Sequence, residues 1–367
     1  MAQSQTIKAA VFEGVKASAP FVNMTQIPAP IAGNGDVVVK VLAARVLSYA
    51  GEIFNGSRTY PSRLPFVPGS GGVGVIKSIG PGTVHLEVGQ LVYIDPTVRA
   101  RDHPISPAVM LQGLIAVGEA QKMQDVWLNG SWAEEMSVPA ENITVIPPSI
   151  QAKYKPAQLT SLGNYAVVYG GFHAANFRPG QTVAITGSTG PFGASAVAVA
   201  LGLGARRVVA AGRNQKQLEE YVAKYGSRVV PVVSTGDEAK DTQLFKEAIG
   251  EGFVLDLVFD ILPPNAPFTI VRSAIGALRF GGTAVLMGGV QASAEVPYYQ
   301  MMSNNITLKG NFMYTRDAPT SLIGLADAGL LDLNTIKPKV FKLDDVEEAI
   351  EWSANHTTPF ESTVIAP

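Results

Sequence analysis

The sequence of 367 residues contains no cysteine, which excludes disulfide bonds, thiolate nucleophiles and cysteine-bound zinc. It has only four histidines, scattered at His85, His103, His173 and His356. Charged residues make up only 16% and the formal net charge is −2, so no basic surface for nucleic acid is indicated. The first residues have no apolar signal core and no apolar run is long enough to cross a bilayer. We therefore expect a soluble cytoplasmic protein without a nucleic-acid or membrane partner.

Apolar residues, in contrast, make up 47% of the chain, which fits a well-buried α/β protein, and the length allows two domains. Short β-branched runs interrupted by glycine dominate the first part, from residue 7 to about residue 94. The segment 95–130 is harder to interpret, with a helix-like part at 109–118. Beyond residue 182, strands and helices alternate, which predicts a parallel sheet covered on both faces. Besides the two strands of the stretch 182–214, which is described next, we expect strands at 229–233, 255–259, 283–287 and 306–312.

The stretch from Thr182 to Asn214 carries the strongest functional signal. It reads as an apolar strand, a glycine-rich turn, an Ala-rich helix and a second strand, the context that a dinucleotide-binding fingerprint requires. Glycine permits a tight turn and a close approach of backbone to phosphate, and the helix N-terminus favours the pyrophosphate. The spacing is GxxGxxG and not the usual GxGxxG, and the alternative is an ordinary strand-to-helix turn. The predicted cofactor-binding residues of the turn are Gly187, Ser188, Thr189, Gly190, Pro191, Phe192 and Gly193.

The end of the second strand indicates which dinucleotide binds. An NAD site usually has a carboxylate there, for the ribose hydroxyls. Here the strand runs into Arg213, Asn214 and Lys216, with no carboxylate among them. Arginine can bind a 2′-phosphate with two parallel hydrogen bonds, so these residues predict NADPH as the cofactor. The alternative is that Arg213 and Lys216 are solvated residues at a helix start.

Three motifs, FVPGSGGVGVI, GSWAEEMSVPAEN and AITGSTGPFG, occur in this order along the chain. By these motifs and their order, the chain resembles the medium-chain dehydrogenase/reductase superfamily across nearly its whole length. Within that superfamily it is most similar to the zinc-independent quinone reductases and enoyl reductases. The resemblance implies an α/β fold with a GroES-like β-rich catalytic domain at 1–160. It also implies a Rossmann doubly wound parallel-sheet domain that binds NADP at 161–313, and a C-terminal segment at 314–367 that returns to the catalytic domain.

Where zinc alcohol dehydrogenases hold their catalytic metal with Cys, His and Cys, the motif match places Leu47, Ser70 and Asn164. None of these is a competent zinc ligand, so we expect no metal. The structural-zinc lobe of that family falls within 95–130, which has no cysteine. A basic residue that the family often places near its C-terminal strand is also missing from 360–363.

Without a metal, the substrate must be polarised by hydroxyl groups, backbone N–H groups or the cofactor ribose. The resemblance places Tyr49 at the family's proton-relay position and makes Tyr60 similar to a cleft tyrosine of quinone reductases. A phenol can donate a hydrogen bond and then a proton to a developing oxyanion. The alternative for each is a packed aromatic ring, and Glu52, which could orient a hydroxyl, is more simply a surface carboxylate. Four aromatic residues are candidates for the wall of an apolar pocket: Trp127, Trp132, Phe312 and Tyr314.

Together these features predict a zinc-independent, NADPH-dependent oxidoreductase that transfers hydride to a small enone, quinone or carbonyl compound. A non-catalytic NADPH-binding protein of the same fold, like a crystallin or a sensor, is the alternative. The last Rossmann strand often pairs with its copy in this superfamily, so the resemblance also implies a homodimer.

Overall fold

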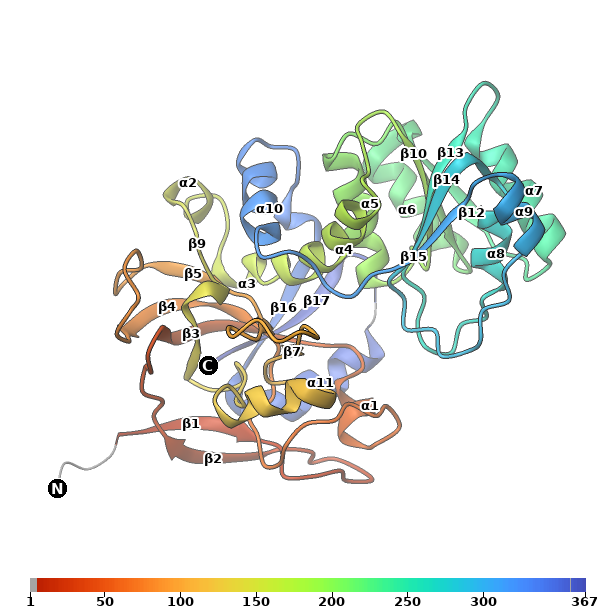
Figure 1. Ribbon diagram of the computed structural model, residues 1–367. Helices are drawn as coiled ribbons and strands as arrows, with labels where there is room; N and C mark the ends of the chain where they lie inside the picture. The colour runs from red at the N-terminus through yellow and green to blue at the C-terminus, as the bar shows by residue number, and fades with distance from the viewer. Residues whose placement is uncertain (1–4, 357) are drawn as a thin grey trace. The chain divides into compact units, whose positions relative to one another are not determined.

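The computed structural model describes residues 5–356 and 358–367, and their contacts divide the chain into two units (Figure 1). The first unit comprises the described residues of Met1–Gly163, Leu333–Thr357 and Glu361–Pro367. The second unit comprises Asn164–Asp332 and Thr358–Phe360. Residues 314–332, which we assigned to the returning segment, therefore make their contacts within the second unit.

The first unit is built mainly of strands. A seven-stranded sheet has the order β16-β17-β3-β4-β5-β9, with β8 paired to β3, and two smaller sheets are formed by β1 with β2 and by β6 with β7. Its strands are β1 (Thr6–Val11), β2 (Asn23–Pro28), β3 (Asp36–Val46), β4 (Gly72–Ile79), β5 (Leu91–Ile94), β6 (Thr97–Arg99), β7 (Val109–Leu111), β8 (Glu135–Pro139), β9 (Ile143–Val145), β16 (Lys337–Lys342) and β17 (Glu361–Ala366). Its helices are the short α1 (Ala50–Phe54), α2 (Pro148–Gln151) and α3 (Pro156–Leu159), and α11 (Val346–Asn355).

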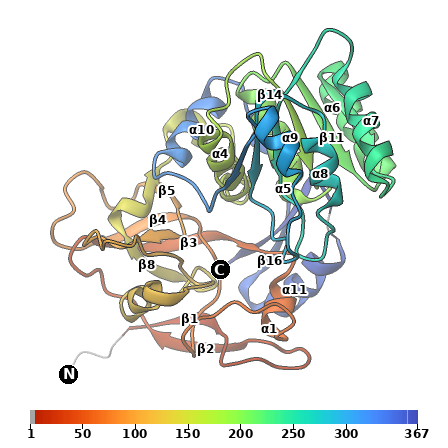
Figure 2. The same ribbon diagram turned by 45° about the vertical axis from the view of Figure 1, so that its right-hand side comes forward.

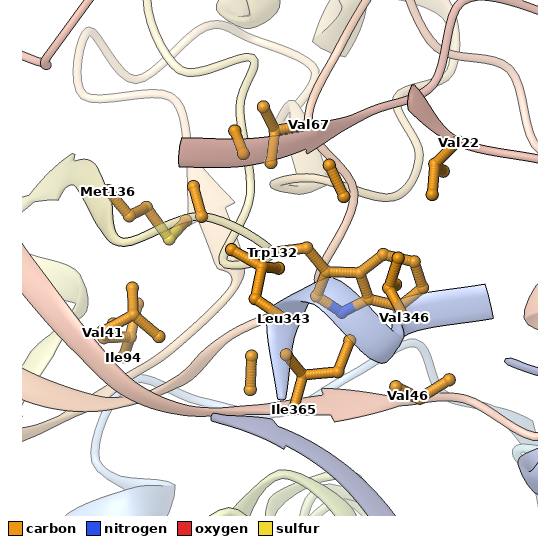
Figure 3. Close-up of a cluster of buried hydrophobic side chains, with 14 of the residues drawn as sticks. Val22, Val41, Val46, Val67, Ile94, Trp132, Met136, Leu343, Val346 and Ile365 are labelled. Atoms are coloured by element: carbon orange, nitrogen blue, oxygen red, sulfur yellow. The ribbon is translucent and has the colours of Figure 1, made fainter. Parts of the chain in front are cut away.

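The glycines of the first motif are explained by close strand packing. A side chain at Gly74 of β4 would place its Cβ 2.3 Å from the carbonyl oxygen of Lys40 in β3, so only glycine allows the two backbones to approach. The core beneath this sheet contains residues from both ends of the chain (Figure 3). Trp132 and Met136 pack there with Leu343 and Ile365, so the C-terminal segment completes the core of the first unit.

The segment 95–130 forms a lobe of its own, and the helix that we expected at 109–118 is wrong. Val109–Leu111 is strand β7, and a 3₁₀ helix begins only at Gly118. The physical reason is that Gly113 and Gly118 have φ angles of 70° and 58°, which no α-helix allows. A small apolar cluster of Val98, Met110, Ala116, Ala120, Met123 and Trp127 holds the lobe.

The second unit is a six-stranded sheet of parallel strands in the order β12-β11-β10-β13-β14-β15 (Figures 1 and 2). Its strands are β10 (Thr182–Thr186), β11 (Arg207–Gly212), β12 (Val229–Val233), β13 (Leu255–Asp260), β14 (Leu278–Leu286) and β15 (Thr307–Gly310). Its helices are α5 (Pro191–Gly202), α6 (Gln215–Tyr225), α7 (Glu238–Ile249), α8 (Thr269–Ile275), α9 (Tyr298–Ser303), α10 (Ala318–Asp327) and most of α4 (Leu162–Ala174).

This order confirms the predicted α/β class with a doubly wound parallel sheet. The chain leaves β10 toward β11 on one side and reaches β13 on the other, so the direction of strand addition reverses beside β10. Ligands of such sheets bind at this reversal, beyond the carboxyl ends of the strands. Within the described ranges, no helix is both long enough and apolar enough to span a membrane.

Candidate cofactor site and active site

The glycine-rich turn lies at the carboxyl end of β10, where the sheet reverses. β10 ends at Thr186, Gly187 has a φ of 75°, and α5 begins at Pro191. A Cβ on Gly193 would lie 2.3 Å from the carbonyl oxygen of Gly187 and 2.4 Å from the Cα of Ser188. Backbone therefore fills the space beside Gly193, which lets the first turn of α5 lie against the strand end. At Gly190 an added Cβ would meet nothing closer than 3.8 Å, so packing within the protein does not require glycine there.

Two polar residues of the turn bind it to β11. The Ser188 hydroxyl donates to the carbonyl oxygen of Ala211 at 2.9 Å, and the Ser188 carbonyl accepts from the hydroxyl of Tyr221. The methyl group of Thr189 fills the space that a Cβ on Gly212 would need. Ser188 and Thr189 thus hold the turn in place, and the Ser188 hydroxyl is already engaged with the protein backbone. The sequence predicted their position but not this structural role.

The three predicted cofactor-binding residues after β11 have two different roles in the structure. Arg213 and Lys216 are exposed at the start of α6. Asn214 is the N-cap of α6, and its side-chain oxygen accepts from the N–H of Gln217 at 3.2 Å. Asn214 therefore has a helix-capping role, whereas the two cations are available to an anionic ligand.

A buried carboxylate, Asp260, lies at the end of β13 and was not among our predicted site residues. Its Oδ1 accepts from the hydroxyl of Thr186 at 2.8 Å and from the N–H of Leu262 at 3.2 Å. Burial raises the pKa of Asp260, while hydrogen bonds from Thr186, Leu262 and Gly288 oppose that rise. Asp260 thus ties together the carboxyl ends of β10, β13 and β14. The available signal was an acidic residue directly after the predicted strand 255–259.

These features fit the pyrophosphate of a dinucleotide. The turn has a left-handed backbone conformation, which favours glycine, at Gly187, and neighbouring backbone leaves no space for a Cβ at Gly193. The first N–H groups of an α-helix have no intrahelical partner and carry partial positive charge. At α5, a helix of 12 residues, they follow the turn directly.

In the first unit, a small and mostly apolar pocket includes two of the three residues that the motif match places at zinc-ligand positions. Leu47 and Ser70 both line it, together with Phe54, Phe66 and Trp132. The third position, Asn164, is buried and belongs to the second unit. A leucine and a serine do not provide the sulfur and nitrogen ligands that zinc prefers. In the part of the chain that the structure describes, no three His, Asp or Glu side chains gather into a possible metal site.

The two predicted catalytic tyrosines lie together. Tyr49 immediately precedes α1, and its phenol interacts with that of Tyr60. Their rings are 6.0 Å apart between centroids, at an interplanar angle of 61°. Burial raises the pKa of Tyr49, so its phenol is a neutral donor at pH 7. Exposed Glu52 pairs with Arg58 at 3.0 Å.

Of the four aromatic residues considered for a pocket wall, the structure places Trp132 in the pocket. Trp127 belongs to the lobe, where its Nε1 donates to Asp36 at 3.2 Å. Phe312 is 67% exposed, and Tyr314 is buried against the backbone of Gly170 in α4.

Comparisons with known proteins agree with this architecture. A family model described as the alcohol dehydrogenase GroES-like domain matches residues 33–148, and one described as zinc-binding dehydrogenase matches residues 191–328. An alcohol dehydrogenase of Geobacillus stearothermophilus is 29% identical over 310 residues, which cover 84% of this chain and 86% of the relative. One of Moraxella sp. (strain TAE123) is 27% identical over 323 residues, which cover 88% and 90%.

Solved structures show the same fold. A thermostable alcohol dehydrogenase from Pyrobaculum aerophilum, solved with cobalt and zinc, superimposes with a TM-score of 0.76 at 21% identity. The match covers 99% of this chain and 100% of that one. The β-rich unit, the parallel-sheet unit and the two matching family models together lead to one conclusion: the chain belongs to the medium-chain dehydrogenase/reductase superfamily and is an oxidoreductase of the alcohol dehydrogenase type.

Proposed function

We propose that this oxidoreductase uses NADPH to reduce a small enone, quinone or carbonyl compound, and that it does so without zinc, in the manner of the quinone and enoyl reductases of the superfamily. In this proposal the reduced nicotinamide supplies the hydride when it is bound. The chain's own residues hold the dinucleotide at the glycine-rich turn and supply a proton from the Tyr49–Tyr60 pair.

The observation that carries the proposal is the pair Leu47 and Ser70 in an apolar pocket of the first unit. The matching model described as zinc-binding dehydrogenase covers residues 191–328 and so does not include this pocket. Since the whole sequence has no cysteine, a thiolate-bound zinc has no ligands here. Polarisation of the substrate then falls to hydroxyl and N–H donors.

Metal independence is directly testable. We expect turnover to survive exhaustive chelation, because neither Leu47 nor Ser70 provides a strong zinc ligand. Elemental analysis of the active protein should find no stoichiometric zinc. A tightly bound zinc whose removal abolishes turnover would refute this part of the proposal.

The preference for NADPH rests on Arg213 and Lys216, which are exposed directly after β11. We expect Arg213→Ala to weaken NADPH binding by about 1.5–3 kcal/mol, the scale of a hydrogen bond to a charged group. NADH binding should be nearly unchanged, since NADH has no 2′-phosphate. Titration gives the dissociation constants of both cofactors for the variant and the wild type. An equal loss of affinity for NADPH and NADH would contradict the assignment of Arg213 to the 2′-phosphate. Lys240→Ala, at an exposed position of α7, is a control that should alter neither constant.

We also propose a homodimer that uses the edge of the parallel sheet. In the described part of the chain, β15 pairs with β14 alone, and an unpaired strand edge is a template for another strand. Just before it, α9 has Tyr298, Tyr299 and Met302 exposed at 79%, 76% and 56%. Sedimentation equilibrium should give twice the chain mass for the wild type and the single mass for Tyr299→Asp. A monomeric wild type at micromolar concentration would contradict this proposal.

The substrate class is tested by NADPH consumption with a panel of enones, quinones and aldehydes, followed by product identification. Turnover on at least one of these classes supports the proposed function. Tight NADPH binding with no turnover on any of them would favour the alternative, a non-catalytic NADPH-binding protein. The cytoplasmic location expected from the sequence stays a prediction.

A further inference from the structure

Arg58 is held in a fixed position beside the tyrosine pair. It lies in the loop after α1, and its backbone N–H donates to the carbonyl oxygen of Glu52 at 2.9 Å. Its Nε lies 3.0 Å from Oε2 of Glu52. The side chain of Arg58 is only 15% exposed, whereas that of Glu52 is 53% exposed. The carboxylate therefore holds the guanidinium from the solvent side and leaves its other face turned inward.

The inward face of Arg58 covers both tyrosine rings. Its guanidinium carbon lies 4.0 Å from the centroid of the Tyr49 ring and 5.9 Å from that of Tyr60. Both distances are within the range in which a cation is attracted to the electron-rich face of an aromatic ring. Because the two rings also contact each other, with centroids 6.0 Å apart, one cation faces a pair of interacting phenols.

A cation over a phenol ring does more than pack. When the phenol loses its proton, negative charge spreads into the ring, so the attraction to the cation becomes stronger. The charged and titratable groups around Tyr49 are Tyr60 and Arg58 in the loop after α1, Arg45 in β3, and Glu52 beyond Arg58. Burial raises the pKa of Tyr49, Tyr60 raises it further, and Arg58 and Arg45 act in the opposite direction.

We propose that Arg58 is a positioning residue for the Tyr49–Tyr60 pair: it holds the rings in place and stabilises the phenolate that remains after the pair has donated a proton. The inference rests on the proposed function. In the step, the phenol O–H bond breaks and a new O–H bond forms on the substrate oxygen, which holds the electron pair released when hydride from NADPH reaches the carbon. The phenolate then recovers a proton from water.

The test measures the ionisation of residue 49 directly and needs no substrate. Tyr49 is replaced by a ring-fluorinated tyrosine, whose electron-withdrawing substituents bring the phenol into a range where absorbance can follow its titration. We expect Arg58→Met to raise the titration midpoint of the phenol at residue 49 by about one pH unit, because the free energy of a cation–π contact corresponds to a pKa shift of about that size. Arg58→Lys should return the midpoint most of the way. If Arg58→Met does not fold, Arg58→Gln removes the same charge with a planar polar side chain.

The matched control is Arg206→Met. Arg206 lies over the ring of Phe253 at the same distance, 4.0 Å, but belongs to the second unit and faces a ring that cannot ionise. Arg206→Met should therefore leave the titration midpoint of the phenol at residue 49 unchanged. An unchanged midpoint in Arg58→Met would overturn the inference and leave the proposed function standing. A shifted midpoint in a wild-type protein that turns over none of the enones, quinones and aldehydes with NADPH would instead contradict the proposed function, so the two failures are distinguishable.

Discussion

Replacing Tyr49 with phenylalanine should lower kcat by roughly 10²-fold or more, the scale of losing one general acid. The ring stays, so its contacts with Tyr60 and Arg58 should hold, and only the hydroxyl is lost. NADPH affinity should be unchanged, since the glycine-rich turn belongs to the second unit. Steady-state kinetics with a substrate found in the panel, together with a cofactor titration, provide both values.

The size of this effect also separates two chemistries. A carbonyl oxygen needs a proton as hydride arrives, so carbonyl reduction should depend strongly on the Tyr49 hydroxyl. An enolate formed by conjugate reduction can be protonated at carbon by solvent after hydride has moved. A Tyr49→Phe protein with the wild-type rate would therefore remove Tyr49 from the mechanism, transfer the role to Tyr60 and favour conjugate reduction. Tyr169→Phe in α4, which removes a hydroxyl from a ring stacked on His173, is the control.

The second large effect is expected at Gly193. An alanine there would place its Cβ 2.3 Å from the carbonyl oxygen of Gly187, and backbone cannot yield as a flexible side chain can. The start of α5 must then move away from the turn, and the N–H groups that would face a bound pyrophosphate move with it. We expect NADPH affinity to fall by roughly 100-fold, about 2.7 kcal/mol. The free energy of unfolding should also fall, by about 1–3 kcal/mol, as in other overpacked sites.

Gly324→Ala is the matched control for this change. Gly324 lies inside α10, and a Cβ there would have no atom within 4 Å. It should leave cofactor affinity unchanged and stabilise the helix slightly, because alanine favours helix over glycine. Calorimetric titration with NADPH and denaturant unfolding of both variants measure the two effects. Wild-type NADPH affinity in Gly193→Ala would show that this turn does not hold the cofactor.

The parts of the fold that were predictable are those where local sequence and final packing agree. The strand ending at Thr186, the glycine-rich turn and the following helix were all predicted from one short stretch, because the residues there follow local rules. The predicted limit between turn and helix was late, since α5 begins at Pro191, inside the predicted turn. Strand β12 at Val229–Val233 has the predicted limits for the same reason. In the lobe, the apolar residues of 109–118 suggested a helix, but Gly113 with its positive φ gave a strand and a turn instead.

The site was less predictable because its contacts join distant segments. Asp260 meets Thr186 across 74 positions of the sequence, and no local pattern announces that contact. The contact between the rings of Tyr49 and Tyr60 depends on the loop after α1 turning back. The family resemblance indicated the two tyrosines separately, and only the structure shows Arg58 over both rings. The structure likewise assigns the Asn214 side chain to the N-cap of α6.

The measurement that tests the central claim most directly is deuteride transfer from NADPH labelled with deuterium at C4 of the nicotinamide. Protein shown by elemental analysis to be free of zinc is incubated with the labelled cofactor and the enone, quinone and aldehyde panel, and the products are analysed by mass spectrometry and NMR. Two cofactors are used, with the deuterium on one or on the other face of C4. The account predicts that one of them gives an enone-derived or aldehyde-derived product with one deuterium at the carbon that accepts hydride, or that a quinone is consumed together with NADPH. Products that form only after zinc is added, or no labelled product and no quinone consumption across the panel, would contradict it.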